Sequence, residues 1–361
     1  MRECFINIYF YLFQQPWSVA IVLPKNDGSD DTKLHCSGSI LDETTILTAA
    51  HCFLGEYPED KSKMTIIVGA NQPTNEEKLK KQKRWVTERK IKSVKIHPLY
   101  NIDLFSAKYD LALVKIEGRS FRFKQSIWPI CIPEEVRKRE YHSGKGYRLV
   151  GYGKDINNPE LCDDFECLKE DSLNAQPTVY CSSKYGQILN TPFDPFHDLI
   201  KKALPKNFDE EDSLICAGIP GQNAGTCPGD SGGILMAKDF YIDKGFITTQ
   251  QAVVHGSRSE CDGERYPSIF VRLDNSEVLP WIFENVFPDK KPKFDKPSPK
   301  PPTARRTSPR PPNTPPTPAP ANPSFITGPI LDGKGVSPIF LIASRVESAN
   351  CPYGKMSIVI K

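Results

Sequence analysis

The sequence lacks the features that mark several large classes of protein. None of its apolar runs reaches the 18 or so residues that span a bilayer, which argues against an integral membrane protein. It has no Cys-X-X-Cys pair, so neither a zinc site nor a thioredoxin-type redox site is expected. It also has no internal repeat and no Asn-X-Ser/Thr sequence with X other than proline, so N-glycosylation is not expected.

An excess of charge of one sign is also missing. The chain has 47 basic and 44 acidic residues, a net charge of +3. The stretch 288–326 alone has a surplus of six basic residues, so the rest of the chain is mildly acidic. No part of that remainder has the clustered basic residues of a nucleic-acid-binding protein, and we expect no nucleic-acid partner.

The composition that is present is that of a globular protein, with 39% hydrophobic and 25% charged residues in a chain of 361. Short apolar runs such as SVAIVL, MTIIVG and LALVKI alternate with Gly, Pro, Asn and Asp clusters from residue 16 to about residue 286. This pattern predicts an all-β barrel or sandwich. One helix is predicted in NSEVLPWIFENV, with Pro280 in its first turn and Pro288 after its end.

The chain divides into four parts by composition: an atypical or truncated start (1–15), a β-domain (16–287), a proline-rich basic linker (288–326) and a C-terminal segment (327–361). Proline fixes φ and removes a donor, so the linker is expected to be an extended, solvated spacer, with docking of SH3-like or WW-like partners as the alternative. The last segment has apolar runs for two strands, which are too few for an independent core.

Eleven cysteines point to disulfides in an oxidising compartment, and therefore to a secreted or extracellular protein. The odd number leaves at least one thiol unpaired or intermolecular. The start, MRECFINIYFYLF, is a poor signal peptide because no small-residue cleavage site follows its aromatic-rich apolar run. A truncated or misassembled start is favoured over a working signal peptide.

Three segments together carry the residues of one reaction centre: LTAAHC with His51, YDLALVKI with Asp110, and GTCPGDSGG with Ser231. A serine hydroxyl is a poor nucleophile at neutral pH, and His51 is the candidate base that would activate it. Asp110 would hold the tautomer of His51 and stabilise the imidazolium. The amides of Gly229 and Ser231 would donate to the oxyanion of a tetrahedral intermediate.

These motifs, in the order His, Asp, Ser, resemble those of the chymotrypsin-like (trypsin/chymotrypsin family) serine proteases over about residues 16–286. The resemblance implies two six-stranded antiparallel β-barrels, a catalytic site in the cleft between them and a C-terminal helix. It also implies a zymogen-derived serine endopeptidase that needs no cofactor and no metal.

The resemblance further implies a set of disulfides. Three pairs are expected: Cys36–Cys52, Cys181–Cys216 and Cys227–Cys261. Cys131 corresponds to the position that tethers a propeptide, and Cys4 is its one N-terminal candidate partner. Cys162 and Cys167 flank a short loop and could bond locally, whereas Cys351 has no evident partner.

The substrate preference is expected to follow from the walls of the specificity pocket. The resemblance places these walls at Gly225, Thr226, Gly256 and Ser268. Trypsin-like members have an aspartate where Gly225 stands, and a buried Lys or Arg of the substrate without that partner would be costly. We therefore expect apolar residues before the scissile bond, although Asp262 and Glu264 lie near in sequence and could add negative charge.

The chain departs from the family pattern at its start. Active members are cut before an Ile-Val-Gly-Gly-like sequence whose new amine pairs with the aspartate before the nucleophile, here Asp230. The start reads CFINIYFYLFQQPW instead, so Asp230 is expected to be a buried carboxylate without a partner, at a cost of about 3–5 kcal/mol, with the Gly229 amide misdirected. A missing N-terminal piece is favoured over a catalytically dead relative.

A second departure is VVHG, residues 253–256, where the family usually has Ser-Trp-Gly. Val254 cannot make the hydrogen bond that this serine makes to the triad aspartate, so Asp110 is expected to lose one orienting contact. His255 takes the place of a tryptophan in the substrate groove. A packing role is expected for it, with a pH-sensitive subsite as the alternative.

Two further segments are expected to have no catalytic role. His97 in KIHPLYN is interpreted as structural, and the run EEKLKK from Glu76 as a solvated loop, although some members of the family bind calcium near it.

The sequence thus predicts a secreted serine endopeptidase that acylates at Ser231. The alternative is a non-catalytic homologue that uses the same fold as a binding or regulatory module. The expected partners are protein or peptide substrates, protein inhibitors and a binding partner of the proline-rich tail.

Overall fold

A computed structural model describes most of the chain between residue 15 and residue 294, and two short segments near its end. The described residues are 15–25, 32–54, 61–101, 107–138, 142–154, 167–189, 213–222, 224–241, 245–257, 261, 266–294, 341–346 and 355–360. The predictions for Cys4, Cys162, Cys351, Asp262, Glu264 and most of the linker concern residues outside these ranges.

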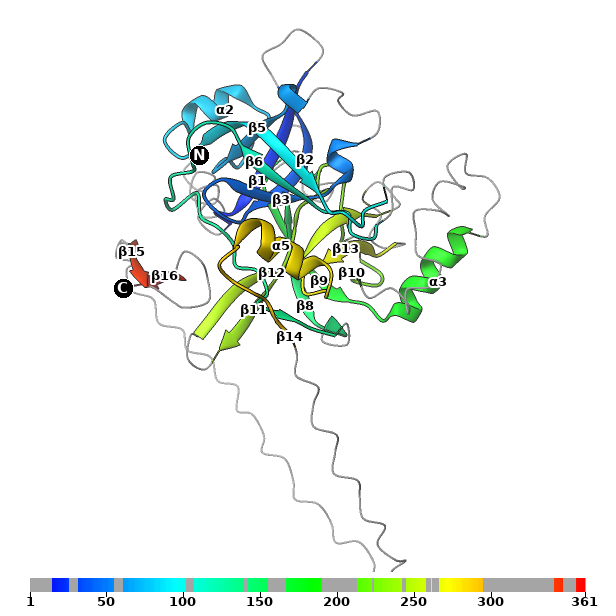
Figure 1. Cartoon of the computed structure of the whole chain (residues 1–361). Helices are drawn as coiled ribbons and strands as arrows, with labels where there is room; N and C mark the ends of the chain where they lie inside the picture. The colour runs from blue at the N-terminus through cyan, green and yellow to red at the C-terminus, as the bar shows by residue number, and fades with distance from the viewer. Residues whose placement is uncertain are drawn as a thin grey trace, which may run out of the picture.

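Two closed antiparallel barrels of six strands each form the body, as predicted (Figure 1). The first has the strand order β1-β2-β3-β6-β5-β4, with β1 Ser18–Pro24, β2 Thr32–Ile40, β3 Thr45–Thr48, β4 Thr65–Val68, β5 Thr87–Ile96 and β6 Ala112–Ile116. The second has the order β10-β13-β12-β11-β8-β9, with β8 Gly146–Gly151, β9 Lys169–Ala175, β10 Leu214–Gly218, β11 Ile234–Tyr241, β12 Gly245–Gly256 and β13 Ser268–Arg272.

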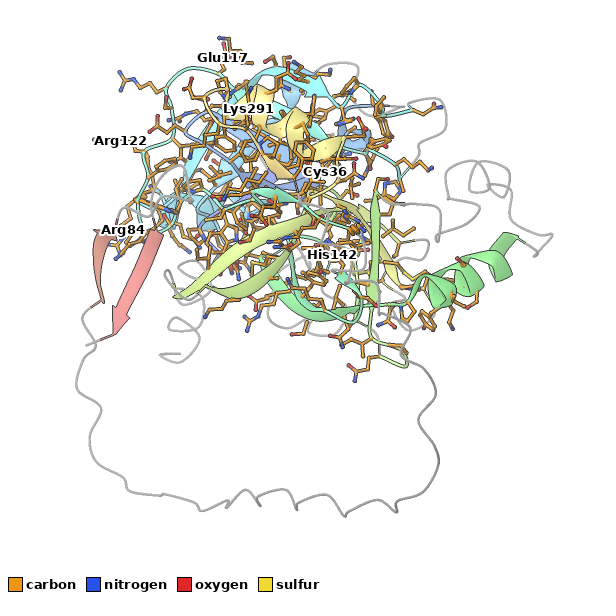
Figure 2. The ribbon with its side chains drawn as sticks, turned by 60° about the horizontal axis from the view of Figure 1, so that its bottom comes forward. Cys36, Arg84, Glu117, Arg122, His142 and Lys291 are labelled. Carbon is orange, nitrogen blue, oxygen red and sulfur yellow. A yellow bond between two sulfur atoms is a disulfide. The ribbon has the colours of Figure 1, made fainter. Side chains whose placement is uncertain are left out.

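Strand β1 illustrates how the alternating direction of side chains along a strand builds the body. Successive side chains of a strand point to opposite faces. Val19 and Ile21 therefore pack inside the first barrel, whereas Ala20 and Val22 belong to a second cluster that also contains Val150 of the second barrel. Both faces of β1 are covered, which explains its almost uninterrupted apolar sequence, SVAIVL. Figure 2 shows the side chains of both barrels, with Cys36 labelled in the first and His142 in the second.

The predicted C-terminal helix is α5, Val278–Val286, and Pro280 stands in its first turn as expected. Its apolar side chains join the cluster between the barrels, and Figure 1 shows the helix over their junction. Trp281 packs edge-on against His97 of the first barrel, with ring centroids 4.7 Å apart. His97 is buried and also stacks on Tyr109, which agrees with the structural role expected for it.

The interpretation of EEKLKK as a loop is wrong, because these residues form the short helix α2, Glu76–Lys81. The side chain of Asn75 caps it by accepting a hydrogen bond from the Lys78 amide at 3.0 Å. Glu76 and Lys80 pair one turn apart at 2.5 Å. The charges therefore support helix formation while they remain in solvent.

The remaining elements lie around the barrels. They are the 3-10 helices η1 (His51–Phe53) and η2 (Lys61–Lys63), helix α3 (Thr178–Leu189), and the strands β7 (Glu135–Val136), β14 (Lys293–Phe294), β15 (Leu341–Val346) and β16 (Lys355–Ile360). β14 pairs in parallel with β7, and β15 pairs with β16 in a separate two-stranded sheet, as the apolar runs of the last segment predicted. In the described part of the chain, no helix is both long and apolar enough to cross a membrane.

The three predicted disulfides are confirmed: Cys36–Cys52, Cys181–Cys216 and Cys227–Cys261. The first two close loops within one barrel each, and the third joins the loop that carries Ser231 to the segment after β12. Cys131 and Cys167 are disulfide-bonded as well. The partners expected for them, Cys4 and Cys162, lie outside the described residues.

A buried ionic group supports the second barrel. Arg272 and Asp274 have no exposed side-chain surface, and the Arg272 Nε donates to Asp274 Oδ1 at 2.8 Å. The His142 Nε2 donates to the same carboxylate at 3.0 Å, while its Nδ1 accepts from the Tyr147 hydroxyl at 2.5 Å. Burial lowers the pKa of His142, and the bond and charge of Asp274 only partly offset this, so the ring is neutral at pH 7.

Asp274→Asn is expected to lower the free energy of unfolding by about 3–5 kcal/mol, because it removes the buried carboxylate that pairs with the buried charge of Arg272. Denaturant unfolding with intact disulfides measures this. Arg148→Met is the control, because its pair with Glu170 has an Arg side chain that is 60% exposed and should contribute less than about 1 kcal/mol. Equal effects of the two substitutions would contradict the structural role of the Asp274 group.

Candidate active site

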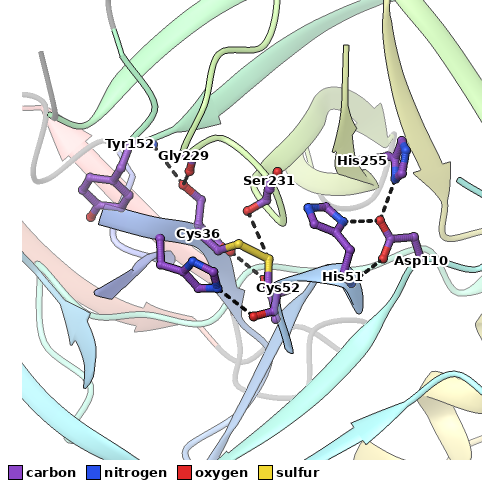
Figure 3. Close-up of a disulfide and its surroundings, with 11 residues drawn as sticks. Cys36, His51, Cys52, Asp110, Tyr152, Gly229, Ser231 and His255 are labelled. Atoms are coloured by element: carbon purple, nitrogen blue, oxygen red, sulfur yellow. Dashed lines mark hydrogen bonds and ion pairs between the residues drawn. A yellow bond between two sulfur atoms is a disulfide. The ribbon is translucent and has the colours of Figure 1, made fainter. Parts of the chain in front are cut away.

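Both barrels contribute to the candidate site. His51 begins η1 shortly after β3, and Asp110 comes just before β6, so these two belong to the first barrel. Ser231 lies in the loop before β11, and His255 is near the end of β12, so these belong to the second. Figure 3 shows Ser231 and Asp110 on opposite sides of the His51 ring. The structure therefore brings together the three residues that the motifs predicted.

Asp110 orients His51 through two hydrogen bonds. The His51 ring donates from Nδ1 to Asp110 Oδ2 at 2.5 Å, and its backbone amide donates to Oδ1 at 2.8 Å. Because a carboxylate only accepts, Nε2 is left to face Ser231 as the basic nitrogen. Tyr109, just before Asp110, has φ +56, a left-handed conformation that a bulky residue adopts only where the surroundings impose it.

The expectation that Asp110 loses an orienting contact is wrong, because His255 supplies one. Its Nδ1 donates to Asp110 Oδ2 at 2.6 Å, so this oxygen accepts from two imidazole rings (Figure 3). The pairing of β12 with β13 changes register between Val254 and Gly256, which is the mark of a β-bulge at His255. A bulge re-aims the side chain it carries, and here it directs the ring to Asp110 rather than leaving it as groove packing.

The buried charges set the proton affinities of the site. Burial alone would lower the pKa of His51, but the charge of Asp110 and the hydrogen bond to it prevail and raise the pKa above 6.5. Burial alone would raise the pKa of Asp110. The charge of His51 and the hydrogen bonds from His255 and His51 outweigh that burial and hold the pKa well below its usual range. Asp110 is thus ionised and His51 is a strengthened base.

The turn that carries Ser231 rests on the first barrel. The Ser37 amide of β2 donates to the Ser231 carbonyl at 2.8 Å, and the Ser37 hydroxyl donates to the Gly229 carbonyl at 2.8 Å. Gly229 and Gly232 both have positive φ, +95 and +81. A Cβ at Gly232 would lie 2.0 Å from Thr48 Oγ1, so this position requires glycine.

The expectation that Asp230 has no partner is also wrong. Its carboxylate, without any exposed surface, pairs with the ammonium of Lys169 at 3.0 Å. The Gly153 amide donates to Oδ1 at 2.8 Å and the Cys227 amide to Oδ2 at 2.9 Å. Lys169 opens β9 opposite Gly151 of β8. No motif in the sequence marks it, since its proximity to Asp230 depends on the pairing of these strands.

Two of the predicted pocket residues are in direct contact. The Ser268 hydroxyl accepts from the Thr226 amide at 2.9 Å and is 3.0 Å from the Thr226 hydroxyl. Both side chains are buried, and the neighbouring Gly225 adds no side chain. Gly256 has φ +145 and follows the bulge at His255.

The imidazole and carboxylate atoms of the site have the spacing of metal ligands, because one ligand atom each of His51, Asp110 and His255 lies within 4.8 Å of the others. Their direct contacts of 2.5 and 2.6 Å are hydrogen bonds, however, and leave no space for a cation between the donor nitrogens and Asp110. The arrangement is suited to moving a proton, not to holding a metal.

Two six-stranded barrels with a His–Asp pair on one and a serine turn on the other define the class of two-barrel serine proteases. The sequence profile of the trypsin family matches residues 11–282, and the chain belongs to that family.

The relatives include a named protease, a clotting factor subunit and a plasminogen activator. The chain is 25% identical to mouse transmembrane protease serine 7 over 253 residues, covering 70% of this chain and 25% of that protein. It is 25% identical to the clotting factor G beta subunit of Tachypleus tridentatus, covering 75% and 76% of the two chains, and 25% identical to pig tissue-type plasminogen activator, covering 78% and 44%. The chain thus spans only a quarter of the length of transmembrane protease serine 7.

Asp110→Asn is expected to move the pKa of His51 from above 6.5 to below it, because the effect of burial remains when the charge of Asp110 is removed. Titration of the His51 ring protons by NMR measures this. Asp42→Asn removes a carboxylate from the same barrel that makes no contact with His51, and it should leave the pKa unchanged. A His51 pKa that does not fall in Asp110→Asn would contradict the assigned cause.

Proposed function

We propose that this chain is a serine endopeptidase that hydrolyses peptide bonds through an acyl-enzyme on Ser231. The observation that carries the proposal is the contact of 2.5 Å between His51 Nδ1 and Asp110 Oδ2, with Ser231 on the opposite side of the ring. This contact fixes the tautomer in which Nε2 can accept the serine proton. Membership of the trypsin family supports the same activity.

In the first half-reaction, the Ser231 Oγ attacks the carbonyl carbon of the scissile bond while His51 Nε2 takes the hydroxyl proton. The amides of Gly229 and Ser231 donate to the oxyanion of the tetrahedral intermediate. His51 then gives the proton to the leaving amine, and the C–N bond breaks. In the second half-reaction, water attacks the acyl carbon with His51 again as the base, which releases the acid and restores Ser231.

His255 contributes to this mechanism as a positioning residue. Its hydrogen bond stabilises the ionised Asp110 and fixes the orientation of Oδ2. It therefore performs the task that Val254 cannot perform. This argument favours a working enzyme over a non-catalytic homologue, because Val254 was one of the two departures that suggested the homologue, the other being the unusual start of the chain.

We further propose that the substrates have apolar residues before the scissile bond. At the pocket the Thr226 hydroxyl donates to the Ser268 hydroxyl, so the two side chains bond to each other. Neither side chain carries a charge. Gly225 supplies no carboxylate. The described residues of the pocket therefore supply no counter-ion for a Lys or Arg side chain, and burial of such a charge without one is costly.

Active-site labelling tests the activity. A fluorophosphonate should label the wild-type chain at Ser231, because only a serine with a working base reacts at a useful rate. Ser231→Ala should not be labelled, and His51→Ala should be labelled at least about a thousandfold more slowly. Ser183→Ala, an exposed serine of α3, should behave as the wild type. An unlabelled, folded wild type would favour the binding module instead.

Gly225→Asp tests the pocket. The wild type is expected to cleave peptides with an apolar residue before the scissile bond at least about tenfold faster than peptides with Lys or Arg, as measured by kcat/KM. The new carboxylate should reverse this preference, because it provides the missing counter-ion. A wild type that already prefers Lys or Arg would show that the pocket is not neutral.

A further inference from the structure

The carboxylate of Asp230 lies in a pocket built from backbone groups and one side chain. Two amides, those of Gly153 and Cys227, donate to its two oxygens, and Lys169 supplies the cation at 3.0 Å. The carboxylate has no exposed surface, and the Lys169 side chain is only 9% exposed. The pair is therefore shielded from water and salt, unlike an ion pair on the surface.

The end of β8 is shaped around this carboxylate. A Cβ at Gly151 would lie 2.3 Å from Asp230 Oδ1, and a Cβ at Gly153 would lie 2.4 Å from Asp230 Cγ. The backbone at both positions thus approaches the carboxylate as closely as a residue without a side chain allows. The Lys169 ammonium is held on its other side by the Lys154 carbonyl at 2.6 Å.

The position of Asp230 determines that of the reactive turn. Asp230 stands between Gly229 and Ser231, whose amides are the proposed oxyanion donors. Its own amide donates to the Cys227 carbonyl at 3.0 Å, and its carbonyl accepts from Gly233 at 2.7 Å. If the carboxylate left its pocket for water, the peptide groups on both sides of it would have to rotate.

We propose that Lys169 is a positioning residue whose ammonium holds Asp230, and with it the Gly229–Ser231 turn, in the reactive conformation without any cleavage of the chain. The inference rests on the proposed function. Its basis is that the cation comes from within the second barrel, at the start of β9, so the ion pair forms when the barrel folds. A new terminal amine is not needed to neutralise Asp230.

The closing experiment compares Lys169→Met with Lys138→Met in the full chain, whose intact mass is verified by mass spectrometry. Lys138 is exposed and is not among the residues that contact Asp230 or Lys169, so the control makes the same chemical change outside the site. Lys169→Met should lower the rate of fluorophosphonate labelling by about 10²–10³, the effect of losing one oxyanion donor. Lys138→Met should label at the wild-type rate.

Chemical rescue separates positioning from a general effect on stability. Ethylammonium should restore labelling of Lys169→Ala by at least about tenfold, because it fits the vacated space and supplies the charge. Tetramethylammonium has the same charge, cannot donate a hydrogen bond and should not rescue. A measurement on the wild type alone covers the case in which the variants do not fold: selective acetylation of the α-amine should leave the labelling rate unchanged.

The outcomes are distinguishable. An intact wild type that does not label, before or after cleavage by an added protease, would overturn the proposed function. An intact wild type that labels only after such cleavage, or that loses labelling when its α-amine is acetylated, would overturn the role of Lys169 and leave the proposed function standing. A folded Lys169→Met variant that labels like the wild type would overturn it as well.

Discussion

The cost of burying a carboxylate is the constraint on which the arrangement of this molecule's reaction centre depends. Asp110 and Asp230 are both without solvent contact, and an ionised carboxylate in that position is tolerated only with several donors around it. Asp110 receives them from two histidines, and Asp230 from Lys169 and two backbone amides. Because these donors come from η1, β9, β12, the residues just after β8 and the loop before β11, satisfying two carboxylates aligns elements of both barrels around the site.

Most of the fold and the central residues could be predicted from the sequence. Short apolar runs such as SVAIVL, broken by clusters of Gly, Pro, Asn and Asp, predicted a β-barrel or sandwich, and the motif around Ser231 predicted its partners by resemblance. Helix α2 could also have been predicted, because Asn75 is a capping residue and the charges of EEKLKK are spaced one turn apart. The polarity of a run of charges is compatible with a loop or a helix, whereas the spacing of Glu76 and Lys80 indicates a helix.

The contacts of His255 and Lys169 could not be predicted in the same way. Whether His255 reaches Asp110 depends on a register change between β12 and β13, and such a bulge leaves no fixed mark in the sequence. Whether Lys169 reaches Asp230 depends on its position opposite Gly151, where the missing side chain leaves room. Both contacts are long-range consequences of strand pairing. His255 takes the place of the family serine at position 254, and Lys169 takes the place of the terminal amine. The absence of these two groups from the sequence had suggested a defective site.

The support of the serine turn by β2 has a consequence for how the protein matures. His51 and Asp110 are built by the first barrel, Ser231 and His255 by the second, and the Ser37 amide joins the two at the Ser231 carbonyl. A chain in which only one barrel has folded has half of the reactive groups and nothing to hold the turn. The proposed peptide-bond hydrolysis therefore requires that both barrels have folded and docked, and a molecule with only one folded barrel would lack it.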